Sequence, residues 1–308
     1  MLIPMFNAER FITETLASLR HQSHSHLEII VVDDGSKDGS TDLVEAWGDP
    51  RLTLVRQSNA GQTAALNTAL RHCHGNYVQY LDADDLISPN KIALQIARLQ
   101  GKPQCIASAE WARFSSEPTE ARFDPEAVWT DLDPLDWLAG SRAQGGGMLF
   151  PALWLLPRQL VEATGPWQED LCLNNDAEYF TRALLKAERV LFCPGARCYY
   201  RSGIRGSLSG HKTIKAWQSQ FKVNALCEQA VRQREDSDRI RRGFALSWQI
   251  LAHSCYPYHP ELAEQALERA KALHSAEIFP EGGSAFLLAS KVLGWRLARR
   301  MQVLSGRP

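Results

Sequence analysis

The first hundred residues alternate between short apolar runs and segments with apolar residues at helical spacing. The run LEIIVVDD (27–34) is rich in β-branched residues, which is typical of a strand buried on both faces. Further strands are predicted at LTLVRQ (52–57), NYVQYLD (76–82) and PQCIASAEWARF (103–114), with helices between them. This alternation predicts right-handed crossovers and a mostly parallel, Rossmann-like sheet flanked by helices, an α/β fold.

The pattern changes in the second half of the chain. Two short strands are predicted at RVLFCP (189–194) and ARCYYRS (196–202), and from about residue 211 the sequence is almost entirely helical. We therefore expect an α/β domain over residues 1–206 and a helical C-terminal extension over residues 207–308.

Composition excludes several classes of protein. The formal net charge is −1, so no basic surface points to nucleic acid as a partner. The start MLIPMFNAER lacks the features of a secretory signal, and no apolar run reaches the roughly 18 residues of a membrane span. The seven cysteines are scattered without a CxxC pair, which predicts free thiols in a reducing, cytoplasmic setting.

Two clusters of carboxylates follow predicted strands. Asp33 and Asp34 end the run at 27–34, and Asp82, Asp84 and Asp85 end or follow the run at 76–82. In open parallel α/β sheets, ligands bind beyond the carboxyl ends of the strands. Both clusters are therefore expected at one rim of one sheet, where a ligand would bind.

Each cluster also has a simpler explanation. Asp, Gly and Ser in VVDDGSKDGS (31–40) form turns, and the acids of LDADD (81–85) suit a helix N-terminus. However, three carboxylates within four positions exceed what one helix end requires. An Asp-x-Asp pair offers oxygen ligands to Mg²⁺ or Mn²⁺, and a metal that also binds a diphosphate would neutralise the cluster.

Five segments, in this order, resemble family 2 glycosyltransferases with the GT-A fold. They are IPMFNAERFITETLASLRHQ (3–22), LEIIVVDDGSKDGSTD (27–42), RQSNAGQTAALNTAL (56–70), GNYVQYLDADDLISPNKI (75–92) and LNNDAEYFTRAL (173–184). One such segment is a weak signal, whereas five in order with near-family spacing are specific.

The resemblance implies a role for each matching position. Asp84 would bind a Mn²⁺ or Mg²⁺ ion, with Asp82 facing the ribose or the water shell of the metal. Asp176 would be the general base, with Glu178 as the second candidate. Residues expected at the nucleotide-sugar are Pro4, Phe6, Asn7, Asp34, Asn59, Gly61, Gln62 and Asp82.

The segment YYRSGIRGSLSGH (199–211) follows the last predicted strand. In the family, a segment at this place often closes over the donor. Arg201 and Arg205 are expected to approach the diphosphate, and His211 is expected to reach the metal. A solvated loop is the alternative interpretation.

The implied reaction is transfer of a sugar, with inversion, from a nucleoside-diphosphate sugar to a hydroxyl of a glycan or lipid-linked acceptor. UDP is the expected nucleotide, with TDP and GDP open. A catalytically inactive nucleotide-sugar-binding scaffold is the alternative, because Leu66 stands where many members carry Arg or Lys. A nucleotidyltransferase is disfavoured because IPMFNAERF (3–11) contains no glycine for a triphosphate loop.

Two further features have a functional and a structural interpretation. Trp154 and Trp167 could stack on sugar rings, although tryptophan is more often a core residue. The segment SKVLGWRLARRMQ (290–302) combines basic and apolar residues on a predicted helix. It is expected either to touch the inner face of a membrane or to pack on its own domain with the basic face in water.

Overall fold

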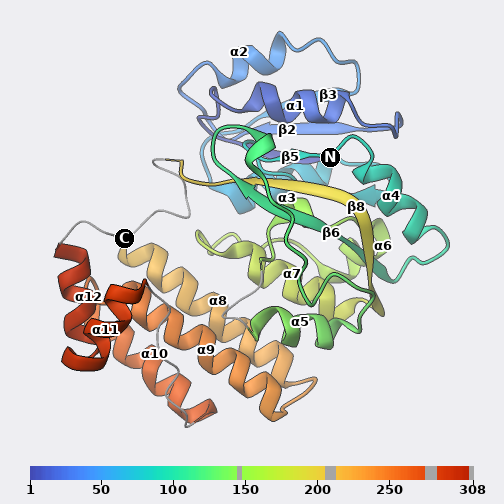
Figure 1. Ribbon diagram of the computed structural model, residues 1–308. Coiled ribbons are helices and arrows are strands. Elements are labelled where there is room, and N and C mark those ends of the chain that lie inside the picture. The colour runs from blue at the N-terminus through green and yellow to red at the C-terminus, as the bar shows by residue number, and fades with distance from the viewer. Residues whose placement is uncertain (144–147, 205–212, 275–282, 305–308) are drawn as a thin grey trace.

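The structure is a computed structural model that describes residues 1–143, 148–204, 213–274 and 283–304. The N-terminal half alternates strands and helices (Figure 1). The elements up to the sixth strand are β1 (Leu2–Met5), α1 (Ile12–Arg20), β2 (Ile29–Asp33), α2 (Ser40–Glu45), β3 (Leu52–Arg56), α3 (Gln62–His72), β4 (Tyr77–Val78), β5 (Leu86–Ile87), α4 (Lys91–Leu99) and β6 (Cys105–Phe114).

Helices dominate the rest of the described chain. The elements are η1 (Pro118–Glu120), α5 (Pro134–Arg142), η2 (Pro151–Leu153), β7 (Leu156–Pro157), α6 (Arg158–Thr164), α7 (Asn175–Lys186), β8 (Arg189–Arg201), α8 (Ile214–Arg232), α9 (Asp238–Cys255), α10 (Pro260–Leu273), α11 (Ser284–Leu293) and α12 (Trp295–Leu304).

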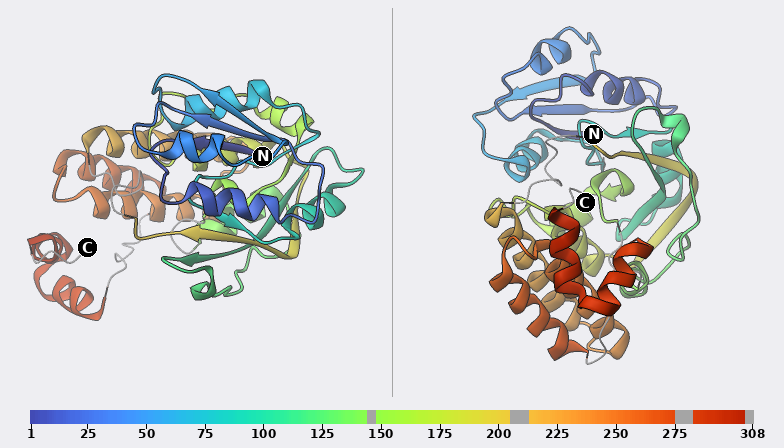
Figure 2. Two further views of the ribbon diagram at one scale, coloured as in Figure 1. Left: turned by 90° about the horizontal axis from the view of Figure 1, so that it is seen from above. Right: turned by 60° about the vertical axis from the view of Figure 1, so that its left-hand side comes forward.

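The strands form three hydrogen-bonded groups that bridges join into one layer. β1, β2 and β3 are parallel neighbours, and Leu2 of β1 bridges to Tyr80 just after β4. β4 pairs antiparallel with β7, and Leu155 beside β7 bridges to Ala107 of β6. β6 runs parallel to β8, and β5 pairs antiparallel with β8. The predicted mostly parallel α/β sheet is confirmed, and Figure 2 shows helices on both of its faces.

Two predicted strands differ from the structure. In the run predicted at 76–82, only Tyr77–Val78 is a strand, because beyond it the chain keeps a single bridge to β1 and then turns into the acidic loop. The two strands predicted at 189–194 and 196–202 are one strand, β8. Gly195 has φ +79° and its N–H donates to Glu110 Oε1 at 2.8 Å, so a bulge lies where the two strands were predicted to be separate.

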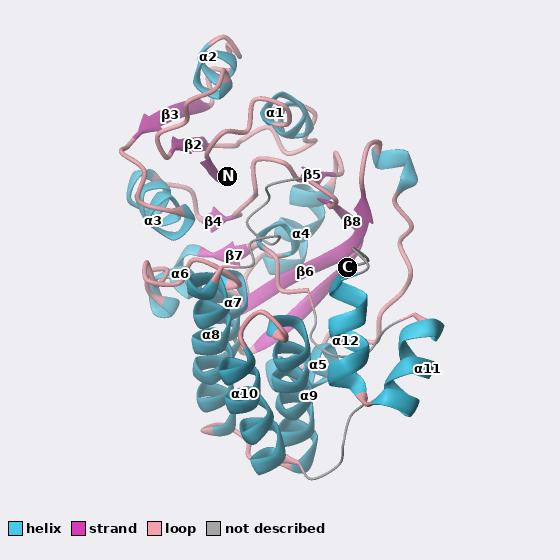
Figure 3. Ribbon diagram, turned by 90° about the vertical axis from the view of Figure 1, so that its left-hand side faces the viewer, coloured by secondary structure: helices cyan, strands magenta, loops and turns pink. Residues whose placement is uncertain are grey.

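The C-terminal helices contribute to two apolar cores. One side of α8 and α9 joins the core of the sheet domain through Val223, Val231 and Phe244. The other side packs on α10 around Trp217 and Trp248, forming a second core. Figure 3 shows α8, α9 and α10 as a bundle below the sheet.

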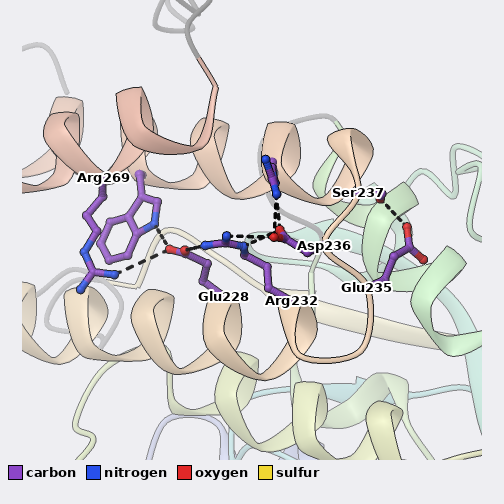
Figure 4. Close-up of polar contacts among 8 residues, drawn as sticks. Glu228, Arg232, Glu235, Asp236, Ser237 and Arg269 are labelled. Carbon is purple, nitrogen blue, oxygen red and sulfur yellow. Dashed lines mark hydrogen bonds and ion pairs between the residues drawn. The ribbon is translucent and has the colours of Figure 1, made fainter.

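A charged network ties the three bundle helices together (Figure 4). Glu228 of α8 is only 5% exposed, and it accepts hydrogen bonds from Trp248 Nε1 and Arg232 Nη1, both at 2.7 Å. Arg232 also bonds to Asp236, and Arg269 of α10 approaches Glu228 at 4.0 Å. The carboxylate is therefore paired and hydrogen-bonded, as a buried charge must be.

All seven thiols are free, as predicted, and all except the half-buried Cys172 are buried. Within the described ranges, none of the helices combines the length and the apolar character that crossing a membrane requires.

Candidate active site

The acidic loop, residues Asp82–Asp85, lies between β4 and β5. Its three carboxylates, those of Asp82, Asp84 and Asp85, repel one another electrostatically. Asp85 is almost fully buried. Asp85 Oδ1 accepts the backbone N–H of Arg201 at 2.9 Å, whereas Oδ2 is buried with no hydrogen-bond partner among the described residues. Such a buried unpaired oxygen is costly, so neighbouring elements must hold the loop in this conformation.

Helix α1 and the end of β8 hold the acidic loop in place. Thr15 Oγ1 of α1 lies 2.9 Å from the carbonyl oxygen of Ala83 and 3.0 Å from that of Asp85. Arg201 donates from Nε to the carbonyl oxygen of Asp84 at 2.9 Å and from Nη2 to Glu14 at 2.7 Å. Two elements that are distant in sequence thus fix the loop.

Arg201 therefore has different contacts from those we expected. Its side chain is 3% exposed, pairs with Glu14, and lies against the rings of Phe11 and Phe114. A guanidinium bound in this way supports the acidic loop, and its approach to a diphosphate stays a prediction. The other two residues predicted in that segment, Arg205 and His211, lie outside the described residues.

The N-terminus of α7 meets the acidic loop through one glutamine. Gln62, the first residue of α3, donates from Nε2 to Asp82 Oδ1 at 2.9 Å. Its Oε1 accepts from Asn175 Nδ2 at 3.2 Å, and Asn175 directly precedes Asp176. Three elements thus bring Asp84 and Asp176 within electrostatic reach of Asp82.

Burial and mutual repulsion raise the pKa values of these carboxyls. Burial, then the charges of Asp84 and Asp176, raises the pKa of Asp82 to about 8, and the hydrogen bond from Gln62 opposes the change. Burial also raises the pKa of Asp84 and that of Asp176. Such a cluster favours either bound protons or a bound cation.

Of the two candidates for a general base, only Asp176 joins this cluster. Its Oδ1 accepts the N–H of Ala177 at 2.8 Å, and it interacts electrostatically with Asp82. Glu178 is 4% exposed and is bound by Arg182 at 2.6 Å and by Gln168 at 2.9 Å. The Glu178 carboxylate is thus already bound in a buried ion pair with Arg182, and Asp176 is the better candidate for the base.

Asp34 organises the loop that precedes α3. Its carboxylate accepts the N–H groups of Ala60 and Gly61 at 2.8 Å each and Gln57 Nε2 at 2.7 Å. Asn59 Nδ2 donates to the Asp34 carbonyl oxygen at 2.9 Å. The structure thus brings together the predicted residues Asp34, Asn59, Gly61 and Gln62. Gly61 has φ +95°, a backbone conformation that favours glycine.

The end of β1 forms a second part of this rim. Asn7 has φ +49°, donates its N–H to Ser36 Oγ and accepts the N–H of Lys37, both at 2.9 Å. These bonds fasten the turn after β1 to the turn after β2. Phe6 is 49% exposed beside them, whereas Pro4 is buried within β1.

A divalent cation can be tested against this donor set. Among the described residues, no three His, Cys, Asp or Glu side chains form a complete metal site. Mg²⁺ and related ions in phosphate-binding sites usually take only one or two carboxylates, with waters and phosphate oxygens as the other ligands. Asp84 and Asp82 fit that role: among the described residues the charge of Arg201 favours ionised Asp84, but its guanidinium bonds to a carbonyl oxygen in the loop and to Glu14, and the pKa values of both carboxyls stay raised.

The two tryptophans belong to the core. Trp154 and Trp167 are at most 2% exposed, and Trp167 stacks on Tyr179 with 4.0 Å between ring centroids. Their interpretation as core residues is confirmed.

Sequence reasoning missed the supporting residues of the site. Gln57 binds Asp34, and Asn175 binds Gln62. Glu14 binds Arg201. Gln57 and Glu14 carry no signal in the sequence. Asn175 stands beside a predicted base, but nothing in the sequence indicates its bond to α3.

Comparison with known proteins identifies the family. Residues 1–164 match the sequence profile of glycosyl transferase family 2. Glycosyltransferase GlyA of Streptococcus pneumoniae is 36% identical over 278 residues, which are 85% of this chain and 36% of GlyA. The uncharacterized glycosyltransferase EpsJ of Bacillus subtilis is 38% identical over 207 residues, 65% of this chain and 60% of EpsJ. The chain thus spans between about a third and two thirds of the length of these relatives.

Solved structures give the same fold. The chain is similar to S. aureus TarS 1–349 with a TM-score of 0.62 and 20% identity, covering 99% of this chain and 90% of that one. TarS 1–349 in complex with UDP-GlcNAc gives a TM-score of 0.61 at 16% identity, covering 99% and 91%. The family profile covers more than half of the 308 residues, and the chain therefore belongs to glycosyl transferase family 2.

Proposed function

We propose that the protein is an inverting glycosyltransferase that moves a sugar from a nucleoside-diphosphate sugar to an acceptor hydroxyl. The observation that carries the proposal is the meeting of Asp82, Asp84 and Asp176 at the rim of the sheet, linked through Gln62. UDP is the expected nucleotide, a choice supported by the UDP-GlcNAc complex of TarS. The predicted nucleotide-contacting residues Phe6, Asn7 and Asp34 lie on neighbouring strand ends of the same sheet.

Asp84, with Asp82, would hold a Mn²⁺ or Mg²⁺ ion. When bound, such an ion would stabilise the negative charge of the departing diphosphate. Arg201 and Glu14 act as positioning residues in this proposal, because they fix the backbone of the acidic loop. We expect the loop of Ala60 and Gly61, which Asp34 holds, to border the nucleotide.

Asp176 would take the proton from the acceptor hydroxyl. The oxygen then bonds to the anomeric carbon as the bond from that carbon to the diphosphate oxygen breaks, and the nucleoside diphosphate leaves. One displacement of this kind inverts the anomeric configuration. Burial raises the pKa of Asp176, which makes its carboxylate a stronger base than an exposed aspartate.

The acceptor is proposed to be a hydroxyl of a glycan or a lipid-linked sugar. One relative, WfgD of Escherichia coli, is named for transfer of glucose to a diphosphoundecaprenol-linked sugar, and it is 33% identical over 100 residues, 32% of this chain. A lipid-linked acceptor favours a cytoplasmic enzyme that works at the inner face of the membrane.

Donor turnover tests the proposal against the alternative of an inactive scaffold. Purified protein is incubated with UDP-sugars, with and without Mn²⁺, and release of UDP is measured. Metal-dependent UDP release that Asp176→Asn slows is the expected result. Tight metal-dependent binding of UDP-sugars, without any turnover across a panel of acceptors, would favour the scaffold.

A further inference from the structure

The last two helices carry most of the exposed apolar surface of the protein. Eleven large hydrophobic residues are exposed among the described residues, and seven of them lie on α11 and α12. The seven, which we call the apolar stripe, are Leu287, Leu288, Val292, Leu293, Leu297, Met301 and Leu304. Figure 2 shows the two helices at the edge of the molecule, beside the bundle.

The large apolar side chains on α11 and α12 point toward solvent, whereas those of an amphipathic helix in a soluble protein usually point into the core. Leu297, Met301 and Leu304 follow helical spacing and should form the buried face of a soluble amphipathic helix. Instead they are 47%, 51% and 86% exposed, while Ala298 is 3% exposed. On α11, Leu288 and Val292 are 66% and 75% exposed, one turn apart. The face that would form a core thus points outward.

A few aromatic contacts fasten the pair to the bundle. Phe286 of α11 and Trp295 of α12 lie against His253 of α9, and Trp295 also contacts Tyr256. Arg300 lies over the ring of Tyr256. These contacts use the inner sides of the helices, so they orient the apolar stripe away from the bundle.

Positive charge accompanies the apolar stripe. Residues 284–304 contain one lysine and three arginines and no acidic residue, in a chain whose net charge is −1. Lys291 is exposed beside the stripe on α11. By contrast, Arg296 pairs with Glu264 of α10, and Arg300 lies over the ring of Tyr256. Basic side chains flanking an apolar face suit an anionic bilayer surface, because both the apolar and the electrostatic contributions favour binding.

We propose that the apolar stripe of α11 and α12 docks on an anionic lipid bilayer, lying in its interface without crossing it. The choice of a lipid surface over a protein partner rests on the pairing of this stripe with a local excess of positive charge. The proposal does not depend on the catalytic role of Asp84 or Asp176, since it concerns the opposite end of the chain.

Vesicle co-sedimentation of the full chain tests this proposal. We expect binding to phosphatidylcholine vesicles that contain about 30% phosphatidylglycerol, weak binding to pure phosphatidylcholine, and release as salt rises from about 0.05 M to about 0.5 M. The triple variant Leu288→Ser, Val292→Ser, Leu304→Ser should weaken binding at least about ten-fold. Lys291→Gln should weaken it about five-fold.

Two controls make the test specific. Ile214→Ser changes a residue that is 46% exposed outside the helix pair, and it should leave vesicle binding unchanged. Circular dichroism shows whether the triple variant keeps its helices. Failure of the wild-type protein to co-sediment with anionic vesicles would overturn the proposal. A stripe that instead joins two copies, detected as a dimer by light scattering that the triple variant dissociates, would overturn it as well.

Discussion

Replacing Asp82 by asparagine should stabilise the metal-free protein at alkaline pH. Asn keeps the oxygen that accepts Gln62 Nε2 and removes the charge that faces Asp84 and Asp176. The pKa of Asp82 is raised from 3.8 to about 8, so the folded state holds the proton more tightly than the unfolded state. The contribution to folding is therefore greatest below pH 3.8 and is lost as the pH rises to about 8.

The size of the effect follows from the same pKa. Each pKa unit between the unfolded and the folded state corresponds to about 1.4 kcal/mol of unfolding free energy. The rise from 3.8 to about 8 therefore sets an upper limit of roughly 6 kcal/mol on the stability lost above pH 8. Asp82 is partly exposed and shares the repulsion with two neighbours, so water and relaxation reduce the effect to roughly 1–2 kcal/mol. For a chain of 308 residues that is a rise in Tm of about 1.5–3 °C.

Thermal unfolding in a chelator measures the prediction. Asp82→Asn should raise the Tm at about pH 8 and raise it by only about a third as much at about pH 5, because most of the stability is lost as the pH rises from 5 to 8. Asp124→Asn, at an exposed position, serves as the matched control and should change neither value. An equal change at both pH values, or a lower Tm at alkaline pH, would refute the electrostatic reasoning.

Four further predictions follow from named contacts. Asp176→Asn should lower kcat about 10²–10⁴-fold with UDP binding nearly intact; lost UDP binding with preserved turnover would contradict the assignment of the base. Because burial raises the pKa of Asp176, kcat should fall as the pH drops through a value above 3.8, and Asp176→Asn should abolish that limb of the pH profile. Arg201→Met should destabilise the protein by about 2–3 kcal/mol and weaken Mn²⁺ binding, whereas Glu14→Gln, at a half-exposed position, should have a smaller effect in urea unfolding and calorimetry. Glu228→Gln should cost about 1–2 kcal/mol in urea unfolding because Arg232 loses one of its two charged partners, while the exposed Glu268→Gln should be neutral.

The strand–helix order was predictable because it depends on local periodicity. The run at 27–34 contains β2, and Asp33 and Asp34 do stand where β2 ends, whereas Asp82 follows the last residue of β4 by four positions. The break expected at Pro194 and Gly195 was wrong, since a long-range pairing with β6 carries β8 through the bulge. Local residue preferences do not report such a tertiary constraint.

The site was predictable only in its motif residues. Asp34 and Asp82 stand in recognisable segments, whereas Gln57 lies in a polar stretch with no motif of its own. The contact of Arg201 with Glu14 joins residues 187 positions apart, and no periodicity indicates it. For α12 the sequence left two orientations open, toward a membrane or onto its own domain, because its spacing resembles that of an ordinary core helix.

The most direct test of the central claim is a crystal structure of the protein soaked with Mn²⁺ and UDP, read through the anomalous signal of manganese. The account predicts one manganese ion bound to Asp84, near Asp82, and to oxygens of the diphosphate. A diphosphate bound at the rim with no manganese on Asp84, or manganese bound elsewhere with Asp84 turned away, would contradict it.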